Sequence, residues 1–381
     1  MKQYTAESVT EGHPDKLCDL IADSVLDDCL AHDPQARVAC EVMATRGRII
    51  VAGEITSSHT PQVVHIVGSL LQRVGYASNG FAVEQLIHTQ SPDIADGVNN
   101  PIKERDSCPA GQLGAGDQGV MVGYACDETP EMLPLPVVLA HRIARSLASA
   151  RKSDAISGLL PDGKAQVTVG YEDNRPVRLD TVVVSTQHRE GVRRADLEQA
   201  IRQTLLPAAL QALPPDQDTK ILINPSGKFV LGGPDADTGL TGRKLMVDSY
   251  GIFAPHGGGA FSGKDATKVD RSGAYMARYI AKNIVAAHLA SRCKVTLAYA
   301  IGKAEPVMVE VDTFGTGTVC ADDCLASAVK LVFGLTPAAM IAQLKLRRPV
   351  YACTAAYGHF GRPGFAWERT DKARILTDTV L

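Results

Sequence analysis

The chain has 381 residues and a formal net charge of −3, with 45% hydrophobic and 21% charged residues. This length can bury a large core in two or three domains, and the small negative charge argues against a protein that binds nucleic acid. No apolar run approaches the ~20 residues of a membrane helix, and the first residues do not form a signal peptide. Nine scattered cysteines without a C-x-x-C pair favour reduced thiols over a zinc site or disulfides. We therefore expect a cytoplasmic protein that binds neither nucleic acid nor membranes.

A helix–strand–strand–helix pattern occurs three times along the chain. In the first occurrence, a helical stripe begins at Leu17, alternation predicts strands over Arg37–Thr45 and Arg48–Thr56, and helical spacing returns from Val63 to Val74. The other two occurrences comprise 136–147, 166–171, 177–185 and 197–205, and then 280–289, 294–301, 307–312 and 325–332. Short polar turns join the strands of each pair.

This repetition predicts an α+β fold of three structurally similar α/β domains, related by pseudo-threefold symmetry, with helices covering the sheets. We expect the first domain at 13–114, the second at 115–225 together with 1–12, and the third at 226–381, with the chain interleaving between them. Residues 88–120 lack periodicity, and an irregular stretch of this length inside a compact domain is usually a functional lid or disordered. We expect a gating loop near 90–114.

The segment from Gly257 to Arg271 combines bare glycines with lysines, an arginine and aspartates. Backbone amides and cations suit phosphate oxygens, and carboxylates suit the metal ion that accompanies a polyphosphate. The pairs Asp15-Lys16 and Arg243-Lys244 repeat this composition. The sequence therefore predicts an enzyme that uses a triphosphate, with a solvated glycine turn as the alternative for this segment.

Two familiar nucleotide-binding motifs are present only in part. The stretch from Gly258 to Lys264 has the spacing of a P-loop, but Asp265 replaces the hydroxyl residue and no buried strand precedes it. The stretch from Gly114 to Gly119 fits G-x-G-x-x-G but leads into a strand, whereas a dinucleotide fingerprint needs strand and then helix. We reject both interpretations.

Three other features carry weaker signals, and the first two are each open to two interpretations. A two-residue turn at 46–47 would place Glu41 and Glu54 diagonally on one sheet face, about 7–8 Å apart at Cα, either as a site or as glutamates on a wet face. His13 at a helix entrance could stabilise a developing oxyanion or merely cap the helix. The stretch around Lys164 is a turn by default.

Together these motifs resemble those of the S-adenosylmethionine synthetase (methionine adenosyltransferase) family, in its bacterial form. The matching stretches are 11–16, 114–119, 239–244 and 256–265, and the similarity continues through 356–362. The resemblance implies that the methionine sulfur attacks C5′ of ATP and that the tripolyphosphate is then hydrolysed to phosphate and diphosphate. A thioether has no proton to lose, so electrostatics and positioning should dominate catalysis.

The resemblance also implies roles for individual residues. The catalytic residues would be His13, Lys164, Arg243 and Lys264, with His13 stabilising the leaving 5′-oxygen. ATP and its polyphosphate would contact His13, Asp162, Lys164, Lys228, Phe229, Asp237, Arg243, Lys244, Ala260 and Lys264. Methionine would contact Glu54, Gln90, Asp237 and Lys268. Asp15 and Asp270 would hold two Mg²⁺ ions, and Glu41 would bind the activating K⁺.

The family site forms between two subunits, so the resemblance implies a dimer, commonly paired into a tetramer. One departure from the family pattern lies at 99–113, which is longer than and unlike the usual bacterial gating loop, so gating and tolerance of methionine analogues are open. Two other functions are weighed: a tripolyphosphatase or ATP hydrolase on the same scaffold, and a non-catalytic partner subunit. The first would lack the methionine contacts and the second would lack charged site residues, yet both sets are present.

Overall fold

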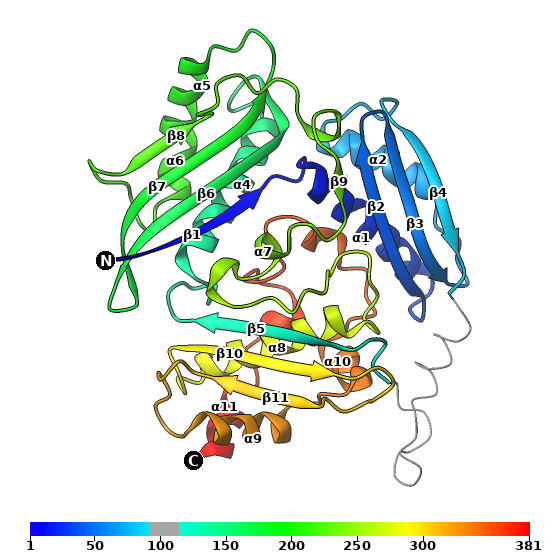
Figure 1. Cartoon of the computed structure of the whole chain (residues 1–381), viewed down its shortest axis with the longest axis vertical. Coiled ribbons are helices and arrows are strands. Elements are labelled where there is room, and N and C mark those ends of the chain that lie inside the picture. The colour runs from blue at the N-terminus through cyan, green and yellow to red at the C-terminus, as the bar shows by residue number, and fades with distance from the viewer. Residues whose placement is uncertain (91–113) are drawn as a thin grey trace.

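The computed structural model describes residues 1–90 and 114–381 and contains three sheets, each with helices packed against it (Figure 1). The strand orders are β4-β3-β2-β9, β1-β6-β7-β8 and β11-β10-β5. The three sheets surround a shared central region, into which the α7 segment projects (Figure 1). This arrangement confirms the predicted α+β class with three domains.

Each unit repeats the predicted order of helix, hairpin and helix. The first contains α1 (Pro14–His32), β2 (Arg37–Thr45), β3 (Arg48–Thr56), α2 (Val63–Val74) and β4 (Ala82–His88). The second contains α4 (Leu135–Lys152), β6 (Leu159–Glu172), β7 (Arg175–His188), α5 (Arg194–Ala200), a π-helical turn (Ile201–Leu205), α6 (Leu206–Ala209) and β8 (Lys220–Ile223). The third contains α8 (Val269–Ala286), β10 (Arg292–Tyr299), β11 (Met308–Asp312), α9 (Asp322–Val332), α10 (Pro337–Leu344) and α11 (Ala373–Val380).

The first hairpin has the predicted register. Thr45 pairs with Arg48 across the turn at 46–47, and Glu41 lies opposite Ala52. Gly47 has φ +68°, the left-handed conformation that a glycine adopts at low cost in such a turn. Ala39 faces Glu54, so Glu41 and Glu54 are diagonal neighbours on one face of the sheet, as predicted.

The second hairpin is longer than predicted. Both strands have 14 residues, and the stretch 161–164, which the sequence suggested was a turn, lies inside β6. The strand accommodates Pro161 because the pairing of β6 with β7 shifts register between Leu159 and Gly163. A bulge of this kind inserts unpaired residues without ending the strand.

Every sheet takes one strand from outside its own hairpin unit. The first strand of each hairpin (β2, β6 and β10) pairs antiparallel with β9 (Gly239–Leu240), β1 (Lys2–Val9) and β5 (Gly119–Cys126), respectively. The strand β1 therefore joins the sheet of the second unit. Likewise, β5 lies in the sheet of the third unit, and β9 lies in the sheet of the first.

The hydrophobic core reflects this interleaving. One continuous core runs through the first and third units and includes α1, α2, α8 and the buried faces of their sheets. A separate core belongs to the second unit, between α4 and the β6–β7 hairpin. The segment α7 (Leu245–Asp248) follows β9 and runs between the units, where the polar side chains described below meet.

Within the described ranges 1–90 and 114–381, no single helix is long and apolar enough to cross a membrane. Among the described helices, α9 and α10 together pass a test of length and composition for a membrane span, but they are bent by 77° at their junction.

Candidate active site

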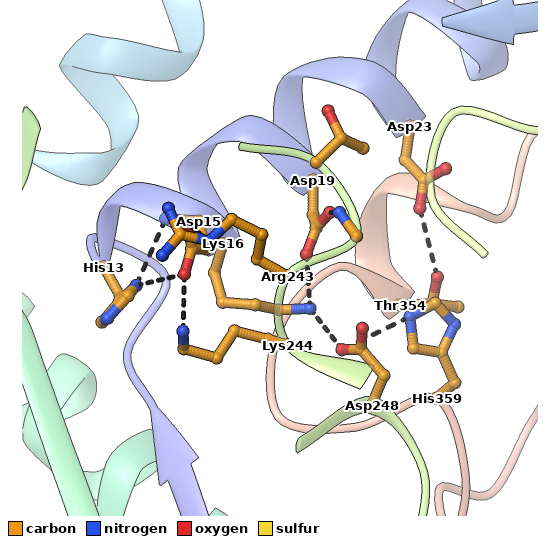
Figure 2. A network of polar contacts seen from close by, with 12 residues as sticks. His13, Asp15, Lys16, Asp19, Asp23, Arg243, Lys244, Asp248, Thr354 and His359 are labelled. Atoms are coloured by element: carbon orange, nitrogen blue, oxygen red, sulfur yellow. Dashed lines mark hydrogen bonds and ion pairs between the residues drawn. The ribbon is translucent and has the colours of Figure 1, made fainter. Parts of the chain in front are cut away.

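Helix α1 carries an aspartate at every fourth position from Asp15 to Asp27, so four carboxylates lie on one helical face (Figure 2 shows the first three). These four residues, Asp15, Asp19, Asp23 and Asp27, accept hydrogen bonds from the amides of Leu240 (3.0 Å), Gly242 (2.9 Å), Gly263 (2.8 Å) and Ala352 (2.8 Å), respectively. We call this set the aspartate row. It fixes the backbone of two motif segments, 239–244 and 256–265, to a single helix.

Buried cations balance the middle of the aspartate row. Lys16 is fully buried, and its ammonium lies 2.9 Å from Asp19 and contacts Asp248 at the end of α7 (Figure 2). Arg271 forms two parallel hydrogen bonds to Asp23, at 2.7 and 2.8 Å. Burial raises the pKa of Asp248 to about 7 despite the opposing effect of Lys16. Removing one partner from such a buried pair is costly, because it leaves an uncompensated charge.

His13 and Asp15 lie where α1 begins, beside two cations from the segment that follows β9. The Lys244 ammonium is 2.5 Å from the Asp15 carboxylate, and the Arg243 Nε is 3.7 Å from it (Figure 2). Burial opposes ionisation of Asp15, but Lys244, the Leu240 amide and His13 outweigh it and hold its pKa below the usual value. The predicted polyphosphate cations Arg243 and Lys244 thus converge on the predicted metal ligand.

His13 is held as a neutral imidazole. Its Nδ1 accepts a hydrogen bond from the Asp15 backbone N–H at 3.2 Å and caps α1. Burial lowers the pKa of His13 to about 4; the positive charge of Lys244 adds to this effect, and the Asp15 carboxylate opposes it. Because Nδ1 is an acceptor, the single ring proton resides on Nε2, which is left to donate.

The second unit brings Asp162 and Lys164 to the same region. Asp162 accepts a hydrogen bond from the Gly233 amide at 2.9 Å, and burial raises its pKa to about 6. Lys164 pairs with Glu7 at 2.6 Å and helps to lower the pKa of His13, whereas the Asp237 carboxylate raises it. The charges of Lys164 and Asp237 therefore both act on the His13 imidazole.

The predicted pair Lys228 and Phe229 lies at the edge of this region. The Lys228 ammonium pairs with Glu190 at 3.0 Å near the surface. The main chain of Phe229 bonds twice to His188, donating its N–H to Nε2 at 3.2 Å and accepting the His188 N–H at 2.9 Å. The backbone of Phe229 is therefore fixed against β7.

Lys264 and Asp270 form a second group in the glycine-rich segment, with a 2.6 Å ion pair. A Cβ atom on Gly259 would lie 2.3 Å from the Asp270 carboxylate, so only glycine fits there. A Cβ atom on Gly242 would lie 2.6 Å from that of Ala260, so the glycine-rich segment packs directly on the segment that carries Arg243 and Lys244. In the described part of the chain, no hydrogen bond or ion pair joins this group to His13 and Asp15.

The residues predicted to bind the substrate methionine lie further apart. The Glu54 carboxylate lies 3.2 Å from Nε2 of His88. The main-chain N–H of Gln90 donates to the Thr56 hydroxyl at 3.3 Å. Lys268 is the N-cap residue of α8 and pairs with the buried Asp265. Among the described residues, no hydrogen bond or ion pair links Glu54, Gln90, Asp237 and Lys268 to one another.

The oxygen donors at the two groups fit hard cations. Asp15 and Asp270 each present a carboxylate next to a lysine, where a polyphosphate and its magnesium could exchange with the ammonium. Glu41 presents a third carboxylate; burial raises its pKa, while Lys264 and the Thr241 hydroxyl lower it. Carboxylate oxygen is a suitable ligand for K⁺ as well as for Mg²⁺.

Sequence reasoning missed Asp19, Asp23 and Asp248, which lie behind the residues predicted to contact substrate. It grouped Lys16 and Arg271 with the residues of a polyphosphate site, whereas both are fully buried and pair with these aspartates. The available signal was the four-residue spacing of aspartates along a helix whose other residues are largely apolar. The gating loop expected within 90–114 lies outside the described residues except for its first and last positions. The stretch after Gly114 leads into the strand β5, which agrees with our rejection of a dinucleotide fingerprint.

A three-domain α+β fold in which lysines and an arginine converge on buried carboxylates is the arrangement of an enzyme with a polyphosphate substrate. Three models of S-adenosylmethionine synthetase domains match this chain: the N-terminal domain at 1–92, the central domain at 112–229 and the C-terminal domain at 231–369. The chain therefore belongs to the S-adenosylmethionine synthetase family, whose members are methionine adenosyltransferases that use ATP and methionine.

The pKa of His13 should depend on Lys244. In Lys244→Met, the lost positive charge and the freed Asp15 carboxylate should raise the pKa of His13 from about 4 toward 6.5. An NMR titration of the imidazole would measure this shift, with the exposed Lys330→Met on α9 as the control. An unchanged pKa in Lys244→Met would contradict the proposed cause.

The same pKa predicts the sign of the pH dependence of stability. The folded pKa lies below the unfolded value, so the unfolded chain binds this proton first as the pH falls. The contribution of His13 to the free energy of unfolding is fully present above about pH 6.5 and is lost as the pH falls toward 4.

Proposed function

We propose that this chain forms S-adenosylmethionine at the site around His13, by attack of the methionine sulfur on C5′ of ATP, and that the same site then hydrolyses tripolyphosphate to phosphate and diphosphate. The observation that carries the proposal is that Lys244 and Arg243 converge on the buried Asp15 beside the half-buried His13, whose pKa Lys164 helps to lower. Such preorganised charge suits a reaction in which negative charge develops on a leaving group.

His13 would act on the leaving oxygen. Its Nδ1 is occupied by the Asp15 amide, so the protonated Nε2 can donate a hydrogen bond to the 5′-oxygen as the carbon–oxygen bond breaks. Its low pKa keeps the ring neutral near pH 7, and Asp15 remains ionised beside it. The sulfur nucleophile needs no base, so no residue is required to remove a proton in this step.

The polyphosphate would replace carboxylates as the partner of the site cations. Lys164, Lys244 and Lys264 each pair with a carboxylate, namely Glu7, Asp15 and Asp270. We propose that Arg243 joins these lysines in binding the phosphate oxygens, while Asp15 and Asp270 each hold one Mg²⁺ and Glu41 holds K⁺. The bound cations would supply further neutralisation of the phosphate charge.

ATP and methionine would both bind near His13. For ATP, we propose contacts with Asp162, Lys228, Phe229, Asp237 and Ala260 in addition to the cations. For methionine, we propose Glu54, Gln90, Asp237 and Lys268, with Asp237 facing the ammonium group. The exposed carboxylate of Asp237 and its effect on the pKa of His13 support this position between the two substrates.

We further propose that two copies of the chain complete the site, as a dimer that pairs into a tetramer. The support is the outer face of β2, β3 and β4, which no helix of the described residues covers and which carries Glu41 and Glu54 beside apolar residues. Leu86 on this face keeps 60% of its surface exposed. We also place the enzyme in the cytoplasm, in agreement with its buried free thiols, such as Cys18 and Cys293.

A product assay tests the proposed reaction directly. Purified protein with ATP, L-methionine, Mg²⁺ and K⁺ should yield S-adenosylmethionine, phosphate and diphosphate in equal amounts by mass spectrometry. A control without methionine should consume little ATP. Full-rate ATP hydrolysis without methionine would instead favour a tripolyphosphatase or ATP hydrolase, and ATP binding without turnover would favour a non-catalytic subunit.

Single substitutions test the assigned roles. Lys264→Ala and Asp15→Asn should each lower turnover by about 100-fold or more, the scale of losing one electrostatic contact in the transition state. The matched control Lys330→Ala removes an exposed lysine from α9 and should leave turnover unchanged. Near-native turnover in both site variants would contradict the role assignment.

A further inference from the structure

Two histidines and an aspartate meet at the end of α1 opposite the catalytic region. One ring nitrogen each of His32 and His59 and one carboxylate oxygen of Asp28 all lie within 4.8 Å of one another. His59 Nε2 is 2.8 Å from Asp28 Oδ2, and the two imidazole rings are stacked with centroids 3.9 Å apart. All three side chains are reachable from solvent, with exposed fractions of 28% for Asp28, 54% for His32 and 25% for His59.

The hydrogen bond of His32 leaves one of its ring nitrogens available to a metal ion. The carbonyl oxygen of Asp28 accepts a hydrogen bond from His32 Nδ1 at 2.9 Å, so Nε2 is the unprotonated nitrogen of the neutral ring. Proteins usually orient a metal-binding histidine by a hydrogen bond from its other ring nitrogen, for example to a main-chain carbonyl. His59 donates its Nε2–H to the Asp28 carboxylate at 2.8 Å, so a metal ion that bridges these two groups would displace this proton.

The local field also favours a cation. Asp28 and His32 lie in the last turn of α1, where the helix dipole places partial negative charge. Asp33, the next residue, is a second carboxylate and accepts hydrogen bonds from the amides of Gln35 and Ser58. These bonds fix the β3–α2 connection, which carries His59, against the end of α1.

We propose that Asp28, His32 and His59 bind a borderline divalent transition-metal ion, with Zn²⁺ as the best match. Two imidazoles and one carboxylate are ligands that Zn²⁺ prefers, and water would complete a tetrahedral set. An ion must lie in the plane of each imidazole, so at least one stacked ring turns on binding, and the exposed His32 is the one with room to do so. The bound ion would tie the end of α1 to the β3–α2 connection.

Isothermal titration calorimetry with ZnCl₂ on the full chain, in excess Mg²⁺ and without ATP, tests this site. The wild-type protein should bind Zn²⁺ at a site whose affinity falls about tenfold or more in His32→Ala and in His59→Ala. The control His65→Ala removes another exposed histidine, on α2, and should titrate as the wild type does.

The readout does not depend on catalysis, so the proposed function and the metal site can fail independently. Circular dichroism of each variant would establish that it folds, and both histidine substitutions lie at the surface. Imidazole NMR resonances of His32 and His59 should shift on addition of Zn²⁺, whereas that of His65 should not. Wild-type titration curves in both histidine variants, or no binding by the wild type, would overturn the proposal.

Discussion

The aspartate row on α1 is the constraint on which the rest of the structure depends. A buried carboxylate is tolerated only when hydrogen bonds and opposite charge compensate its loss of water. Each aspartate meets this need with an amide from a distant segment: Asp15 and Asp19 share 239–244, whereas Asp23 and Asp27 use Gly263 and Ala352. Asp15, Asp19 and Asp23 add a cation. The cost of burying these charges therefore specifies where the two motif segments lie relative to His13.

This constraint explains why the site can carry opposite charges in close contact. The cations that would bind polyphosphate are held by carboxylates in the described structure, so they are already positioned before a substrate arrives. Behind them, Lys16 and Arg271 are fully buried and keep the supporting helix charge-balanced. The site cations can thus exchange carboxylates for phosphate, while the buried pairs behind them stay fixed. This division suits electrostatic catalysis, in which the environment must not reorganise during the reaction.

How much of this structure could be predicted from the sequence depends on how far apart along the chain the interacting segments lie. The β2–β3 hairpin followed from local alternation and a two-residue turn, and its register was predicted correctly. The pairing of β5 with β10 and of β9 with β2 joins segments more than 160 residues apart, which no local pattern indicates. Pro161 suggested a turn because the register shift that admits it in β6 depends on its partner β7. Similarly, His13 and Lys264 were found by motif, whereas Asp19 and Asp248 gain meaning only from the fold.

Hydrogen exchange measured by mass spectrometry in Asp19→Ala would test the central claim most directly. If the aspartate row holds the polyphosphate segment, loss of the bond to the Gly242 amide should speed exchange across 239–248, while 373–380 in α11 should exchange as before. The exposed Asp378→Ala on α11 serves as the matched control. Unchanged exchange across 239–248 in Asp19→Ala would show that this segment is positioned by other contacts and would contradict the account.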